Sequence, residues 1–203
     1  MISNILKKDS RITAKLPELL TLPKVVKVHK FTEESVASFC NDVSEALTIG
    51  QNILPIVIDS YGGQVYSLLA MIDILKSIPI PVATIAVGKA MSCGAILFSC
   101  GSDGKRYMSP NSTLMIHDVS GGQSGKVLEL KEDAKEAERL NDLIYKLMAR
   151  NVGKSDDYFM KIVHEKGHAD WFLTPQECVD HGLANHIRIP MFKTEVKVES
   201  TLE

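Results

Sequence analysis

The sequence has no apolar run long enough to cross a bilayer, few cysteines and little net charge. Its longest apolar stretches, such as residues 78–88, fall well short of the roughly 20 residues that a membrane-spanning helix needs. The four cysteines form no CxxC pair, which argues against a zinc site and predicts reduced, mostly buried thiols, as in cytoplasmic proteins. The net charge of −2 gives the chain no overall attraction for nucleic acid. We therefore expect a cytoplasmic protein that binds neither membrane nor nucleic acid and needs no metal or cofactor.

The chain also lacks internal repeats, low-complexity blocks and a recognisable secretory signal. Hydrophobic residues make up 45% of the 203 residues, which is ample for a packed core. We expect one domain over residues 25–189, preceded by an N-terminal extension at 1–24 and followed by a polar tail at 190–203.

Strand-like and helix-like segments alternate along this domain. Apolar, β-branched runs predict strands, and amphipathic or capped segments predict helices. The expected strands cover residues 25–28, 53–58, 82–87 and 112–116, and the expected helices cover 33–47, 64–76, 93–100, 126–151, 156–164 and 175–181. Buried strands alternating with helices indicate an α/β domain with mostly parallel strands. The pattern fits a doubly wound sheet or a spiral of β-β-α units.

Ser92 stands where the strand at 82–87 gives way to a helix of small residues. A hydroxyl at that point lies near free backbone N–H groups and the positive end of the helix, which suits a nucleophile whose attack generates an oxyanion. Serine is also one of the commonest helix N-caps, and on this segment alone the capping role is the better interpretation.

Three further segments carry residues suited to the same chemistry. Gly63 ends the strand at 53–58 within a glycine pair, so its N–H can approach a substrate oxygen closely. His117 follows the strand at 112–116, and imidazole titrates near neutrality, as a general base requires. Asp170 precedes an apolar run, where a partly buried carboxylate can orient an imidazole. Taken singly, each has an ordinary structural explanation: a tight turn, a structural histidine and a turn aspartate.

Taken together and in order, these segments resemble the proteolytic subunit of the Clp protease family. Residues 59–65, DSYGGQV, are similar to the family's N-S-P-G-G-x-V, and residues 88–95, GKAMSCGA, to its G-x-A-A-S-M-G-A. Residues 104–117 follow its G-K-R-x-x-x-P-N-S-x-x-M-I-H. A glycine-rich segment at 121–125 and the DWFLT run at 170–174 also match.

The resemblance implies a spiral of β-β-α units, the crotonase-like fold of this family, with a protruding long handle helix at about 126–151. It implies a serine endopeptidase in which Ser92 attacks the peptide carbonyl, His117 transfers protons and Asp170 orients His117. The N–H groups of Gly63 and Cys93 would form the oxyanion hole. The substrate would pair as a strand with Gly121, Gly122, Gln123, Ser124 and Gly125.

The resemblance further implies a homo-oligomer, as a heptameric ring or a double ring, that cleaves polypeptides fed by an AAA+ unfoldase of the Clp type. Some positions depart from the family pattern. Near the expected site these are Tyr61, Met91 and Cys93. On the expected surface for docking the unfoldase they are Pro55 and Val57, and at the expected contact between rings the position is Ala169. The stretch between His117 and Asp170 is also longer than usual. One ring or two, and dependence on an unfoldase, therefore stay open.

Several alternatives compete with this interpretation. The run HEKGH at 164–168 matches the H-E-x-x-H of zinc peptidases, although Gly167 weakens a helix where the second ligand must stand. Lys89 could serve in a Ser-Lys dyad, and crotonase-like enzymes of related fold act on acyl-CoA thioesters. A catalytically weak scaffold and a phage maturation protease without an unfoldase are the remaining candidates.

Overall fold

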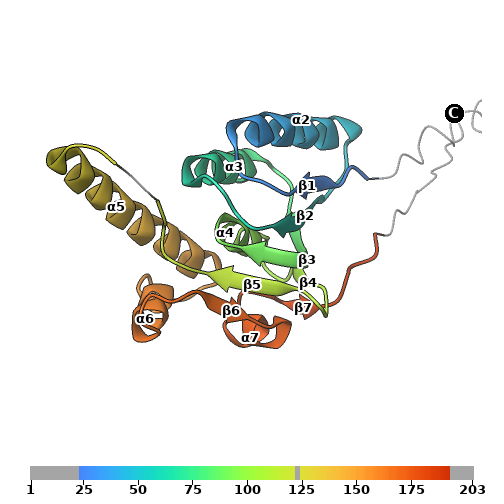
Figure 1. Ribbon diagram of the computed structural model, residues 1–203. Helices are drawn as coiled ribbons and strands as arrows, with labels where there is room; N and C mark the ends of the chain where they lie inside the picture. The colour runs from blue at the N-terminus through green and yellow to red at the C-terminus, as the bar shows by residue number, and fades with distance from the viewer. Residues whose placement is uncertain (1–22, 122–123, 193–203) are drawn as a thin grey trace, which may run out of the picture.

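A parallel β-sheet forms the centre of the molecule (Figure 1). The computed structural model describes residues 23–121 and 124–192. The strands described are β1 (Val26–Val28), β2 (Leu54–Ser60), β3 (Val82–Met91), β4 (Arg106–Met108), β5 (Thr113–Ile116), β6 (Trp171–Leu173) and β7 (His186–Ile187). The sheet runs β1-β2-β3-β4-β7 with every neighbouring pair parallel, while β5 pairs with the end of β3 and β6 pairs antiparallel with β5.

Helices cover the sheet and one of them extends away from it. They are α2 (Glu33–Ile49), α3 (Val65–Ser77), α4 (Cys93–Ser99), α5 (Val127–Asn151), α6 (Tyr158–Glu165) and α7 (Pro175–Asp180). Figure 1 shows α2 and α3 together on one side of the sheet, α6 and α7 on the other, and α5 reaching outward from the body. Among the described residues, no helix combines the length and apolar character needed to span a membrane.

The order of the strands distinguishes a spiral from a doubly wound sheet. Strands β1 to β4 follow one another across the sheet without the reversal of order that a doubly wound sheet requires. Right-handed crossovers between successive parallel strands then place α2, α3 and α4 on the same face. The core lies between these helices and the sheet and includes Ile56, Ile58, Leu68, Met71 and Leu97, each at most 1% exposed.

Local signals in the sequence fix several helix ends. Thr32 caps α2, where its side chain accepts from the Ser35 N–H while the Ser35 hydroxyl accepts from the Thr32 N–H. Gly50 closes the same helix in the left-handed conformation, at φ 76°. Thr174 caps α7, and Pro175 occupies its first turn. The predicted helices are thus confirmed, with their ends shifted by a few residues at most.

The strand predictions need three corrections. The strand expected at 82–87 continues through Gly88 to Met91, because residues 89–91 pair with β5. Three short strands, β4, β6 and β7, were not expected at all. One of them, β6, runs antiparallel to its neighbour, so the sheet is parallel except at this edge. The α/β class with mostly parallel strands is confirmed.

Candidate active site

Ser92 occupies a sharp junction between the end of β3 and the start of α4. Its backbone has φ 55° and ψ −123°, a region that L-residues rarely adopt and that glycine occupies readily. The conformation is held on both sides, since the Ser92 N–H donates to the Met115 carbonyl (2.8 Å) and the Ser92 carbonyl accepts from the Ala95 N–H (2.9 Å). The Ser92 side chain makes no capping hydrogen bond to α4. The hydroxyl therefore does not serve as an ordinary N-cap.

Gly62 lies directly against Ser92. At φ 106°, it holds a backbone conformation that favours glycine, and a Cβ built there would lie 2.7 Å from Ser92 Cβ and 3.1 Å from Ser92 Oγ. The glycine is thus required for its close approach as well as for its conformation. The turn itself is fixed by the Gly62 N–H, which donates to Ser60 Oγ (3.0 Å).

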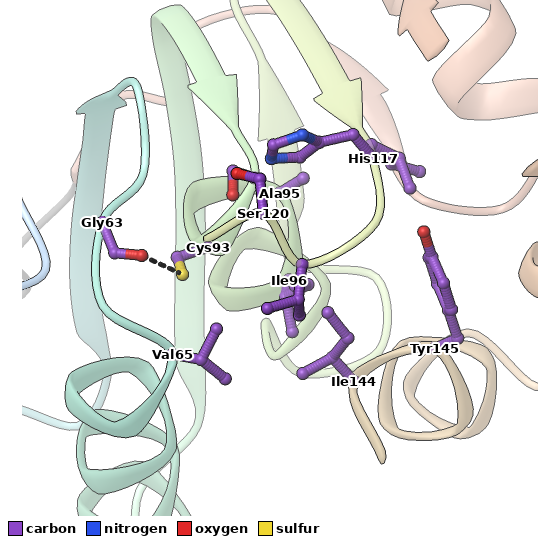
Figure 2. Close-up of a pocket in the computed structure, with 12 residues that line it drawn as sticks. Gly63, Val65, Cys93, Ala95, Ile96, His117, Ser120, Ile144 and Tyr145 are labelled. Atoms are coloured by element: carbon purple, nitrogen blue, oxygen red, sulfur yellow. Dashed lines mark hydrogen bonds between the residues drawn. The ribbon is translucent and has the colours of Figure 1, made fainter. Parts of the chain in front are cut away.

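Two backbone N–H groups near Ser92 donate to no backbone carbonyl within the described part of the chain. Gly63 follows the turn at Gly62. The neighbouring Phe31 carbonyl accepts from the Gln64 N–H and not from the Gly63 N–H. The N–H of Cys93 opens α4, where the first turn has no intrahelical acceptors. The two residues are also linked through the Cys93 thiol, which donates to the Gly63 carbonyl (3.2 Å; dashed in Figure 2).

The Cys93 side chain is buried, and burial raises the pKa of its thiol to about 11. At neutral pH the thiol therefore stays protonated, and it remains a hydrogen-bond donor to Gly63 rather than a nucleophile.

His117 and Asp170 face each other across the end of the β5–β6 pair. The antiparallel register pairs Ile116 with Trp171, so the next residues outward, His117 and Asp170, come opposite one another. His117 Nδ1 lies 3.5 Å from Asp170 Oδ1. The Asp170 side chain is 54% exposed, which makes it more open to solvent than its apolar context predicted.

One pocket of about 50 Å³ joins most of these groups. Ser92, His117, Gly63 and Cys93 all line it, together with apolar side chains from α3, α4 and α5. Figure 2 shows Gly63 and Cys93 on one side of this pocket and His117 and Tyr145 on the other. The residues that carry a hydroxyl, an imidazole and these two N–H groups thus line one small cavity, and the Asp170 carboxylate lies beside the imidazole.

A family model described as Clp protease matches residues 23–190, most of the chain. The chain belongs to the Clp protease family. One of its relatives is the protein of Deinococcus radiodurans named ATP-dependent Clp protease proteolytic subunit, which is 35% identical over 126 residues. That alignment covers 62% of this chain and 60% of the relative, so the chain spans about 60% of the length of this curated relative.

Membership of the Clp protease family confirms the resemblance drawn from the sequence motifs, and with it the fold class. The structure describes only part of the glycine-rich segment at residues 121–125. Gly121, Ser124 and Gly125 fall within the described residues, while Gly122 and Gln123 lie outside them. The pairing of this segment with a substrate strand stays a prediction.

The HEKGH segment does not form the helical arrangement that a zinc peptidase uses. Helix α6 ends at Glu165, and both Gly167 and His168 have positive φ. His164 and His168 therefore do not project from successive turns of one helix, which the H-E-x-x-H arrangement requires. His168 Nδ1 instead lies 2.6 Å from Asp118 Oδ2. Within residues 23–121 and 124–192, no three His, Cys, Asp or Glu side chains gather as metal ligands.

Lys89 is likewise engaged elsewhere. Its ammonium lies 2.6 Å from Asp59 Oδ1 and 4.4 Å from the centre of the Tyr61 ring. The hydrogen bond to Asp59 raises the pKa of Lys89, so the amine stays protonated and is unsuited to act as the base of a Ser-Lys dyad.

The cysteine prediction is correct in part. All four cysteines are free thiols, but only Cys93 and Cys178 are buried, while Cys40 is exposed and Cys100 is half-buried.

The sequence motifs do not include Asp118, and they give Tyr145 no role. Asp118 directly follows His117, and its carboxylate accepts a hydrogen bond from the Tyr145 hydroxyl (2.8 Å). The position of Asp118 beside the proposed base was the one available signal, but its partner is 27 residues away on α5.

Proposed function

We propose that this Clp protease family member is a serine endopeptidase that uses Ser92, His117 and Asp170. The observation that carries the proposal is the placement of Ser92 on a strained junction, with its hydroxyl free of any capping bond, in one pocket with His117. Backbone strain of this kind persists only where the surrounding structure holds it, and it is concentrated at functional sites.

Catalysis would proceed through an acyl-enzyme. Ser92 Oγ attacks the scissile carbonyl carbon while its proton passes to His117 Nε2. The peptide C–N bond then breaks, the imidazolium returns the proton to the leaving amine, and the acyl group stays on Ser92. Water activated by His117 hydrolyses this ester, which releases the second product and restores the serine.

The charge that develops on the carbonyl oxygen needs donors aimed at it. We assign this role to the N–H groups of Gly63 and Cys93, since neither donates to a backbone carbonyl within the described residues and both residues line the pocket. The hydrogen bond from the Cys93 thiol to the Gly63 carbonyl links the two residues.

Asp170 would hold the proton on His117 Nδ1, so that Nε2 faces Ser92, and would stabilise the imidazolium. The 3.5 Å separation between Nδ1 and Oδ1 exceeds an ordinary hydrogen bond. Such bonds are often long without substrate and shorten in the complex, and we expect the same here.

The substrate class follows from the site and the family together. We propose that polypeptides bind as an added strand along residues 121–125, which reads the backbone more than the side chains. We also propose a homo-oligomeric ring or double ring in the cytoplasm, with an AAA+ unfoldase of the Clp type as a partner. The relative's name, ATP-dependent Clp protease proteolytic subunit, supports an assembly of subunits and an ATP-using partner.

A fluorophosphonate probe, which reacts with activated serines, tests the proposal directly. We expect one label per chain, mapped by mass spectrometry to Ser92 and lost in Ser92→Ala. His117→Ala and Asp170→Asn should each lower kcat on a fluorogenic peptide by roughly 10⁴-fold. Ser120→Ala is the matched control, since Ser120 lines the same pocket, and it should keep the label.

Three results would count against the proposal. Labelling of Ser120 instead of Ser92 would move the nucleophile. Folded, assembled protein that takes up no label and cleaves no peptide would favour a catalytically idle scaffold. Activity lost to a chelator would return attention to the HEKGH segment.

A further inference from the structure

The Asp118 carboxylate joins three segments that surround the proposed base and acid. Its Oδ1 accepts from the Tyr145 hydroxyl of α5 at 2.8 Å. Its Oδ2 lies 2.6 Å from His168 Nδ1, and because an ionised carboxylate only accepts, the imidazole N–H is the donor. Asp118 is the residue after His117, and His168 lies two residues before Asp170. One carboxylate therefore connects the chain on both sides of the His117–Asp170 pair.

Among the described residues, the direct contact between His117 and Asp170 is weak. The last described β5–β6 register pair is Ile116 with Trp171, one residue short of His117 and Asp170. The contact between His117 and Asp170 is itself long, at 3.5 Å, and Asp170 is more than half exposed. A partner outside the pair is therefore needed to fix the relative position of the two side chains.

Helix α5 supplies the fixed end of this connection. Tyr145 is 1% exposed and packs in the core, and the pKa of its phenol is raised by burial first and by the bond to Asp118 second. The hydroxyl thus stays protonated at neutral pH and remains a donor. A second bond acts in the same direction, since the Val119 N–H donates to Asn141 Oδ1 of α5 at 2.6 Å. The segment after His117 is held to α5 at two successive residues.

We propose that Asp118 is a positioning residue that keeps His117 and Asp170 in register by bridging Tyr145 and His168. The inference rests on the proposed function, because it assigns a role around the same base and acid. Asp118 touches neither the pocket nor the reacting atoms in this assignment, and it acts only through its neighbours. Loss of the bridge should therefore lower kcat and leave substrate binding almost unchanged.

The test compares Asp118→Ala, Asp118→Asn and Tyr145→Phe with Asp157→Asn, a control that removes an exposed carboxylate paired with Lys161 on α6. A misplacement of about 1 Å costs up to roughly 10²-fold in rate. We therefore expect kcat for a fluorogenic peptide to fall about 10- to 100-fold in Asp118→Ala, with KM changed by less than about twofold. Asp118→Asn keeps an acceptor for Tyr145 and should recover part of the loss.

A double variant separates positioning from general destabilisation. If Tyr145 acts through Asp118, adding Tyr145→Phe to Asp118→Ala should lower kcat no further, since the two residues share one interaction. Tyr145→Phe removes only a hydroxyl, so it also serves if Asp118→Ala fails to fold, and kcat should then fall about threefold or more. Additive losses, or wild-type kcat in folded Asp118→Ala or Tyr145→Phe, would overturn the inference.

A crystal structure of Asp118→Ala gives a readout that does not depend on activity. The bridge predicts that His117 Nδ1 and Asp170 Oδ1 move apart beyond their present 3.5 Å. If the wild-type protein takes up no fluorophosphonate label, the proposed function fails and this distance still decides the inference. If the label is present and the distance and kcat stay unchanged in the variant, only the inference fails.

Discussion

Replacing Gly62 by alanine should disable Ser92 with a single methyl group. The new Cβ would lie 2.7 Å from Ser92 Cβ and 3.1 Å from the Met91 carbonyl oxygen. Carbon atoms in contact stay about 3.5–4.0 Å apart, so Ser92 or the turn must move by roughly 1 Å. A misplacement of that size costs about 10²-fold in rate, equivalent to about 2.7 kcal/mol of transition-state stabilisation. We expect kcat/KM for a fluorogenic peptide to fall by about that factor.

The positive φ of Gly62 adds a cost to folding that has to be separated from the contact. An L-residue held in such a backbone conformation loses roughly 1–3 kcal/mol of stability. Gly104→Ala is the matched control, since Gly104 also has positive φ, at 70°, but a Cβ there would meet no atom within 4 Å. Both variants should lose stability in urea denaturation, and only Gly62→Ala should lose kcat/KM. Wild-type kcat/KM in Gly62→Ala, or an equal loss in Gly104→Ala, would refute the reasoning.

Two further predictions concern the thiols and a helix cap. Burial raises the pKa of the Cys93 thiol to about 11, so little of this thiol is ionised at pH 8. Iodoacetamide should therefore modify the exposed Cys40 at least about tenfold faster than Cys93. Equal rates of modification by peptide mass mapping would contradict the burial of Cys93. Thr32→Ala removes the acceptor for the Ser35 N–H at the start of α2 and should lower the free energy of unfolding by about 1 kcal/mol. Thr32→Ser keeps an acceptor and should retain the wild-type free energy of unfolding. Urea denaturation of the three proteins measures both effects, and an alanine variant as stable as the wild type would show that the cap does not contribute.

The parts of the fold that local sequence determines could be predicted. The cap at Thr32 depends on a side chain and a backbone group three residues apart. The long helix α5 repeats its apolar positions along its own length. Ser92 was placed at a strand-to-helix junction because an apolar run and a run of small residues adjoin there.

The parts that were missed depend on distant partners. The short strand β4 exists through pairing such as Tyr107 with His186, and β7 is the other side of that pair. Their few residues carry no periodicity of their own, because two or three positions cannot display one. The extension of β3 past Gly88 has the same origin, since its last residues pair with β5.

The candidate site divides along the same line. Motifs predicted Ser92, His117 and Asp170 as site residues, because each sits in a distinctive local segment. The exposure of Asp170 and the bond from Tyr145 to Asp118 arise from how α5 and the segment before β6 pack against the end of β5. No local pattern encodes contacts between segments so far apart, which is why the supporting residues appeared only in the structure.

The backbone of Ser92 sets stability and chemistry against each other at one position. At φ 55° and ψ −123°, glycine would be less strained than serine, and the free energy of folding alone would favour glycine by roughly 1–3 kcal/mol. The chain nonetheless carries serine there. Backbone hydrogen bonds with Met115 and Ala95 hold it, and the missing side chain of Gly62 leaves room for it. In the proposed mechanism, part of the stability of the surrounding sheet holds the Ser92 hydroxyl in place, so mutations that weaken β3 or β5 should reduce activity before they unfold the protein.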